Sequence, residues 1–126
     1  MRDSFAAQQL VATIGARLTR VTAGEIEIRV PFRPDLTQQH GFLHAGVVMS
    51  VLDSACGYAA LSLTEEGVGV LTVEFKTNLL APARGEELIA RGRVLRAGGR
   101  LPCARRSRRW LPTAPRLRWL SCLPRS

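Results

Sequence analysis

The chain has 126 residues, of which 46% are hydrophobic, so it is long enough for one globular domain and too short for two ordinary ones. No stretch reaches the roughly 20 consecutive apolar residues of a membrane span, and the first residues lack the apolar run of a signal peptide, so we expect a cytoplasmic protein without a membrane partner. The formal net charge of +8 comes from residues 100–126, because residues 1–99 hold ten basic and ten acidic groups.

The sequence predicts no metal and no separate cofactor. Three cysteines, Cys56, Cys103 and Cys122, show neither a paired spacing nor a CxxC motif. They give little support for a disulfide framework or a thiolate zinc site, and they fit a reducing compartment. His40 and His44 stand four residues apart, but no third ligand follows at zinc spacing.

The N-terminal part predicts a helix followed by a hairpin. Apolar residues recur at helical spacing over residues 4–14, and Gly15 is a plausible stop. Residues 16–21 and 25–32 predict two strands around a tight turn, because apolar and charged residues alternate along the second of them. A loop over residues 33–43 follows.

The middle of the chain predicts one long helix and two further strands. Residues 44–63 carry an apolar stripe that predicts a buried central helix, formed by Val48, Val51, Leu52, Ala55, Ala59 and Leu63. Residues 68–80 and 86–96 are rich in aliphatic residues and predict strands. The adjacent glycines within residues 97–100 predict a hairpin turn, after which a partner strand should follow.

Residues 101–126 show no pattern of that partner strand. They hold four prolines and both tryptophans, without a period of 2 or 3.6. Three interpretations compete: a genuine basic tail, a disordered linker, or translation in a wrong reading frame of a GC-rich gene. We favour the last, because acidic residues, glycine and alternation disappear together. The folded domain is therefore expected to comprise residues 1–100.

Asp53 is the candidate catalytic residue of the predicted central helix. At 100° per residue it shares a face with mostly small residues, namely Gly46, Met49, Ser50, Cys56, Gly57 and Ala60. A carboxylate with space beside it can act as a general base, although a mid-helix Asp is also compatible with a structural role. Gly41 and Gly46 lie at the approach to the helix N-terminus, where free N–H groups can polarise a carbonyl oxygen. Alternatively, these glycines only permit a tight turn and close packing.

Asp53 and the helix N-terminus cannot reach one atom from the same chain. Asp53 lies eight residues beyond Ala45, which is about 12 Å along a helix axis. If both groups act on one carbonyl, they belong to different copies in a symmetric assembly, with the active site at the subunit interface. We therefore expect a homodimer or a dimer of dimers.

Three separated segments, residues 38–46, 53–60 and 71–82, resemble in order and spacing the hot-dog-fold acyl-CoA thioesterases, especially the phenylacetate-pathway type and the 4-hydroxybenzoyl-CoA thioesterase superfamily. The resemblance covers residues 1 to about 100. It implies an α+β hot-dog fold, with an antiparallel sheet around the long helix, and a hydrolase acting on acyl-CoA. Residues 101–126 do not resemble the two strands that end the family fold, so the last strands are expected to be missing or replaced and the activity is in doubt.

The resemblance also implies the site residues. Asp53 matches the helix carboxylate that activates water, and Ala45 takes the place of a glycine whose N–H polarises the thioester carbonyl. The catalytic group also includes His44 of the same segment and Gln38, whose side chain orients the water or the thioester. Gly46 and Thr72 are expected to lie near the substrate. The coenzyme A part of the substrate is expected to contact Arg96, Gly98, Gly99 and Arg100.

Two other functions compete with this interpretation. A hydroxyacyl dehydratase on the same fold also uses a carboxylate and a histidine, but it separates them by a proline-rich segment that is not seen here. A basic nucleic-acid-binding protein would use the Arg/Trp-rich residues 101–126, but these contain no known reading module. We expect acyl-CoA as the substrate and no nucleic acid as a partner; the acyl-chain preference is left open by the sequence.

Overall fold

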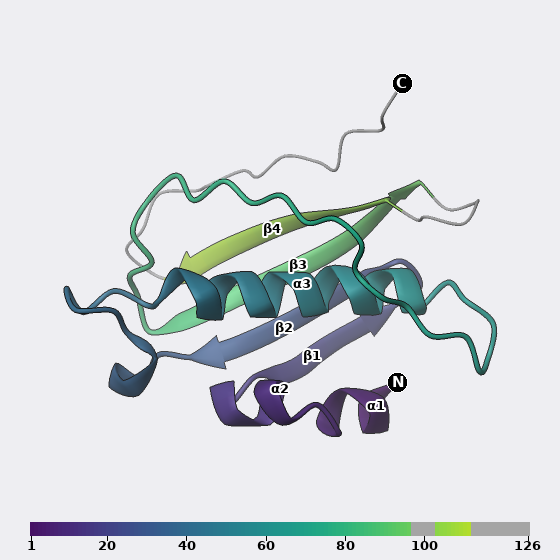
Figure 1. The fold of residues 1–126 in the computed structure, drawn as a ribbon, viewed down its shortest axis with the longest axis horizontal. Helices are drawn as coiled ribbons and strands as arrows, with labels where there is room; N and C mark the ends of the chain where they lie inside the picture. Colours follow the sequence, from purple (N-terminus) through teal and green to yellow (C-terminus); the bar gives the residue numbers. More distant parts are fainter. Residues whose placement is uncertain (97–102, 112–126) are drawn as a thin grey trace.

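The computed structural model describes residues 1–96 and 103–111. Within this part, four strands form one antiparallel sheet in the order β1-β2-β3-β4, with the bounds Arg17–Thr22, Glu25–Pro31, Glu87–Arg96 and Cys103–Leu111. The long helix α3 (Ala45–Leu61) lies across one face of the sheet, while α1 (Arg2–Ala6) and α2 (Gln9–Ile14) lie beside β1 (Figure 1). This arrangement confirms the predicted α+β fold with an antiparallel sheet and a long central helix.

The β1–β2 hairpin forms where the alternating pattern predicts it. Its pairing runs from Arg17 with Arg29 to Thr22 with Glu25, and Gly24 adopts a left-handed φ of 75° in the turn. Both strands agree with the prediction to within one residue at each end. The core between the sheet and α3 includes the aliphatic residues of β2 and β3, namely Ile26, Ile28, Val30, Leu88 and Ala90.

The N-terminal helix is divided into two, whereas the sequence predicts one helix over residues 4–14. The chain leaves helical geometry at Gln8, which has a ψ of 111°. The break allows both short helices to reach the core: Phe5 of α1 packs edge-on against Tyr58 of α3, with ring centroids 5.4 Å apart, and Val11 of α2 is buried. Gly15 ends α2 with a φ of 74°, as predicted.

Helix α3 confirms the predicted central helix, with slightly tighter bounds than residues 44–63. His44 is its N-cap residue, and the helix ends at Leu61. Leu63 lies beyond this end and is 45% exposed, so its predicted place in the buried stripe is wrong. The other members of the stripe are buried against the sheet: Val48, Val51, Leu52, Ala55 and Ala59. The loop before α3 contains a single 3-10 turn, η1 (Pro34–Leu36).

Residues 68–80 do not form the strand that their composition predicts. The segment runs irregularly from the end of α3 past β4 to the region before β3 (Figure 1), and no described strand pairs with it. Leu71 and Val73 are therefore 92% and 78% exposed. β-propensity reflects packing against neighbouring strands, so an apolar pattern without a partner does not produce a strand.

Strand β4 follows the predicted turn, although we expected no strand in residues 101–126. It pairs with β3 from Arg96 with Cys103 to Glu87 with Leu111, so that expectation is wrong for residues 103–111. Ladder hydrogen bonds join backbone groups, and a strand can form without the side-chain alternation that is missing here. The predicted turn falls within 97–102, which lies outside the described residues, as does the segment 112–126.

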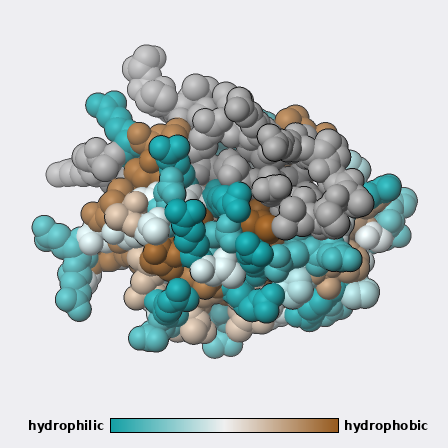
Figure 2. Space-filling model, turned by 180° about the vertical axis from the view of Figure 1, so that it is seen from behind, coloured by the Kyte–Doolittle hydropathy of each residue, from teal (hydrophilic) through white to brown (hydrophobic). Residues whose placement is uncertain are grey.

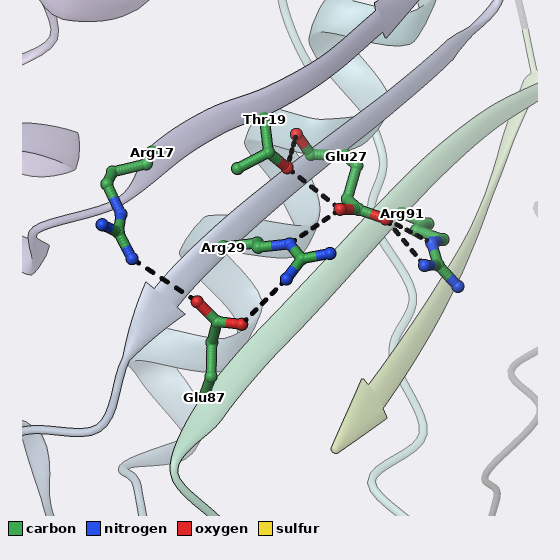
Figure 3. A network of polar contacts seen from close by, with 6 residues as sticks. All are labelled: Arg17, Thr19, Glu27, Arg29, Glu87 and Arg91. Carbon is green, nitrogen blue, oxygen red and sulfur yellow. Dashed lines mark hydrogen bonds and ion pairs between the residues drawn. The ribbon is translucent and has the colours of Figure 1, made fainter. Parts of the chain in front are cut away.

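The face of the sheet that points away from α3 carries a network of ion pairs (Figure 3), and hydrophilic side chains cover much of its described part in Figure 2. Glu27 is 7% exposed and accepts hydrogen bonds from Thr19, Arg29 and Arg91 at 2.8–3.0 Å. Burial by itself raises the pKa of the Glu27 carboxyl, but the hydrogen bonds from Arg29, Arg91 and Thr19 outweigh it and lower the pKa to about 2. This carboxylate is therefore held ionised at the centre of the network.

Candidate active site

Asp53 lies on the face of α3 that points away from the sheet. The side chain is half-buried, and Met49, one turn earlier, is exposed. A Cβ added to Gly57, one turn later, would meet nothing within 4 Å. Of the residues predicted to share this face, only Ala60 is buried. The small and exposed neighbours leave open space beside the Asp53 carboxylate.

The hydroxyl of Thr72 donates a hydrogen bond to this carboxylate, with 2.8 Å between Oγ1 and Oδ1. Thr72 belongs to the irregular residues 68–80, so the contact joins α3 to a distant part of the chain. It orients the carboxylate through one oxygen and leaves Oδ2 without a hydrogen bond from the described residues. The structure thus brings together two of the residues that the sequence analysis selected.

His44 and Gly46 are joined at the N-terminus of α3. The Gly46 N–H donates to Nδ1 of His44 at 2.9 Å, so the imidazole caps the helix and carries its proton on Nε2 when neutral. A Cβ at position 46 would lie 3.0 Å from that Nδ1, so the His44 cap leaves little space for any residue larger than glycine. The N–H of Ala45 has no acceptor among the described residues and is the free donor at this helix end.

Gln38 lies in the turn that precedes α3. Its backbone N–H donates to the Phe42 carbonyl at 2.8 Å, and its side-chain Oε1 accepts from the His40 N–H. The backbone N–H of Leu43 in turn donates to the Ala83 carbonyl at 3.2 Å. These bonds seat the turn beside the loop that leads into β3 and engage the Gln38 Oε1 within its own turn, and the described residues show no hydrogen bond between Gln38 and Asp53.

Arg96, the one predicted coenzyme A contact within the described residues, lies at the other end of the helix. The β3 backbone N–H of Val94 donates to the Gly24 carbonyl, and the Gly24 N–H donates to the hydroxyl of Ser62, just past the end of α3. The last part of β3, with the exposed Arg96, therefore lies near the C-terminal end of α3, far from Ala45. The remaining predicted contacts, Gly98, Gly99 and Arg100, lie outside the described residues.

One pair that the sequence analysis did not single out lies beside the helix entrance. The guanidinium carbon of Arg84 stands 4.5 Å above the centre of the Phe42 ring. Arg84 follows Ala83, whose carbonyl holds Leu43. The only sequence signal was an arginine two residues before a predicted strand, which is too common to indicate a site.

Two further properties hold for the part of the chain that the structure describes. Residues 1–96 contain no group of three His, Cys, Asp or Glu side chains that could hold a metal ion. No helix formed by them combines the length and the apolar character needed to cross a membrane.

Curated relatives of this chain are named as presumed esterases. One from Saccharolobus solfataricus is 29% identical over 92 residues, which cover 73% of this chain and 65% of the relative. One from Halobacterium salinarum is 32% identical over 94 residues, which cover 71% and 62%. The chain therefore spans less than two thirds of the length of these relatives.

Solved structures share the fold. A thioesterase family protein from Silicibacter pomeroyi is 54% identical with a TM-score of 0.83, covering 85% of this chain and 79% of that protein. The PaaI protein from the phenylacetic acid degradation operon of Escherichia coli is 17% identical with a TM-score of 0.76, covering 84% and 75%. The predicted hot-dog fold is confirmed. Residues 40–104 also match the thioesterase superfamily, and since they are 65 of the 126 residues, the chain belongs to the thioesterase superfamily.

Proposed function

We propose that this chain hydrolyses acyl-CoA thioesters, with Asp53 as the general base, in a homodimer or a dimer of dimers. Membership of the thioesterase superfamily supports the reaction type. The observation that carries the assignment of Asp53 is its position on the open face of α3, with the carboxylate oriented by Thr72.

The reaction requires a base and a donor on opposite sides of the thioester. Asp53 takes a proton from water through Oδ2, and the water oxygen attacks the carbonyl carbon. The N–H of Ala45 in a second copy donates to the oxygen on which negative charge develops. The carbon–sulfur bond then breaks, the protonated Asp53 returns the proton to the sulfur, and the products are a carboxylic acid and free coenzyme A.

Two copies are needed because of the distance along α3. Ala45 and Asp53 are separated by eight residues of one continuous helix, about 12 Å, so both cannot contact the same carbonyl group from a single chain. In a two-fold assembly the α3 entrance of one copy can meet the middle of α3 in the other. His44 supports the donor by capping the same helix turn and presents Nε2–H as a second donor.

A thiol-release assay over aryl, short-chain and long-chain acyl-CoA tests the proposal. Asp53→Asn is expected to lower kcat by roughly 100-fold or more, the range attributed to a positioned general base. Asp3→Asn is the matched control, because Asp3 is an exposed residue of α1 whose side chain makes no hydrogen bond or ion pair in the described structure. Equal turnover by Asp53→Asn and wild type, or no thiol release from any acyl-CoA, would overturn the proposal.

A further inference from the structure

Among the nine arginines of residues 1–96, two have neither an acidic partner nor a hydrogen bond within the described residues: Arg84 and Arg96. Arg2 donates to a backbone carbonyl, and the other six form ion pairs with Asp or Glu. Each of these six therefore has a carboxylate partner within the described residues, and they share Glu25, Glu27, Asp35 and Glu87. Arg84 differs from Arg96 in being held in place, because it lies over the Phe42 ring.

The donors of Arg84 have no hydrogen-bond acceptor among the described residues, although the guanidinium group lies over the Phe42 ring. A guanidinium group lying over an aromatic face is attracted by the ring without using its N–H groups. Those groups point outward from the edge of the plane, in the fork geometry that matches phosphate oxygens. Glu86, two residues later, forms no ion pair with Arg84 in the described structure.

The location places this fork beside the proposed reaction site. The hydrogen bond from Leu43 to the Ala83 carbonyl joins the Arg84 loop to the residue preceding His44, so Arg84 and the free N–H of Ala45 flank the same entrance of α3. The positive end of the helix dipole adds to the positive charge there. A ligand with a carbonyl at Ala45 and an anionic group further out would meet both.

We propose that Arg84, supported by Phe42, binds a phosphate of the coenzyme A nucleotide. This inference rests on the proposed function and deepens it, because it assigns the recognition of the anionic part of the substrate. The phosphate site then belongs to the same copy as the Ala45 donor and lies at the N-terminal end of α3, rather than at the Arg96 end of β3.

The test compares one acyl group on coenzyme A and on N-acetylcysteamine, which lacks every phosphate. Arg84→Gln is expected to raise KM for the acyl-CoA roughly 10- to 100-fold, the range for hydrogen bonds to a charged group, and to leave KM for the acyl-N-acetylcysteamine unchanged. Arg84→Lys should recover part of the loss, because it keeps the charge without the fork. Arg20→Gln, an exposed arginine of β1, is the control and should alter neither value.

Binding of free coenzyme A, measured by isothermal titration calorimetry, tests the site independently of turnover. Arg84→Gln should weaken this binding by the same factor, while Arg96→Gln should not. Equal effects of Arg84→Gln on both thioesters, unchanged coenzyme A affinity, or a selective loss in Arg96→Gln instead would overturn the inference. Wild-type protein that binds coenzyme A through Arg84 but hydrolyses neither thioester would contradict the proposed function alone.

Discussion

Gly92 of β3 lies directly against Ala55 of α3, with no space for a side chain between them. A Cβ built on Gly92 would come within 2.1 Å of the Ala55 carbonyl oxygen, far closer than real Cβ contacts allow. The absent side chain lets the helix approach the sheet closely. Gly92 therefore sets the distance between the sheet and α3, the helix that carries Asp53.

Gly92→Ala is expected to destabilise the fold, because the α3 backbone has to move away from β3. Overpacking of this kind costs about 1–3 kcal/mol, and each kcal/mol lowers Tm by roughly 2–8 °C in domains of about 60–250 residues. Gly57→Ala is the matched control on α3, where nothing lies within 4 Å and the helix gains about 0.5–1 kcal/mol. Thermal unfolding should give a lower Tm for Gly92→Ala and a higher Tm for Gly57→Ala than for the wild type. An unchanged Tm for Gly92→Ala would show that the helix does not pack directly on β3.

Thr72→Val is expected to lower kcat/KM for acyl-CoA by about 10-fold with little change in Tm. Valine keeps the shape of threonine but removes the hydroxyl that orients Asp53, a hydrogen bond to a charged group. Steady-state kinetics measure the effect. Thr64→Val removes a hydroxyl that donates only to the Leu61 carbonyl, so its activity should match wild type. A Thr72→Val variant with full activity would assign the Thr72 contact to packing alone.

Substitutions of His44 can separate its capping role from a role toward the substrate. His44→Ala removes the acceptor for the Gly46 N–H and should cost about 1 kcal/mol of stability, whereas His44→Asn retains a good N-cap and should keep it. Both variants should lose activity, because neither supplies the Nε2–H donor. Chemical denaturation and the thiol-release assay give the two readouts. Full activity of His44→Asn would limit His44 to capping.

The Glu27 network predicts a loss of stability in acid. The folded pKa of Glu27 is about 2 against an ordinary 4.5, so its contribution is complete above pH 4.5 and disappears as the pH falls toward 2. The size is about 3 kcal/mol at most, at 1.36 kcal/mol for each pKa unit. Denaturant unfolding should show that the free energy of unfolding of the wild type falls between pH 4.5 and pH 2. In Glu27→Gln this part of the pH dependence should be absent. Glu25→Gln, which alters a more exposed ion pair, should retain it.

The hypothesis of a wrong reading frame for residues 101–126 rests on the sequence, where acidic residues, glycine and alternation disappear together. We expect an adjacent frame of the gene to encode an alternating apolar strand pair, and a chain carrying it to have a higher Tm. Random composition or a stop codon in those frames would contradict the hypothesis.

The fold elements with a strong local pattern could be predicted from the sequence. The β1–β2 hairpin and α3 follow from alternation and helical periodicity over neighbouring residues, which is information the chain carries locally. The position of Asp53 on the open face of α3 follows from the same periodicity. The division of the first helix at Gln8 could not be predicted, because it depends on where Phe5 meets Tyr58.

Motif spacing and periodicity are enough to select Asp53, His44 and Ala45 as candidates, since they belong to one helix and its entrance. The contact of Thr72 with Asp53, the position of Arg84 over Phe42 and the absence of a strand in residues 68–80 depend on the folded arrangement. The physical reason is that a strand or a side-chain contact needs a partner supplied from elsewhere in the chain. Local periodicity specifies a face, whereas packing specifies what that face meets.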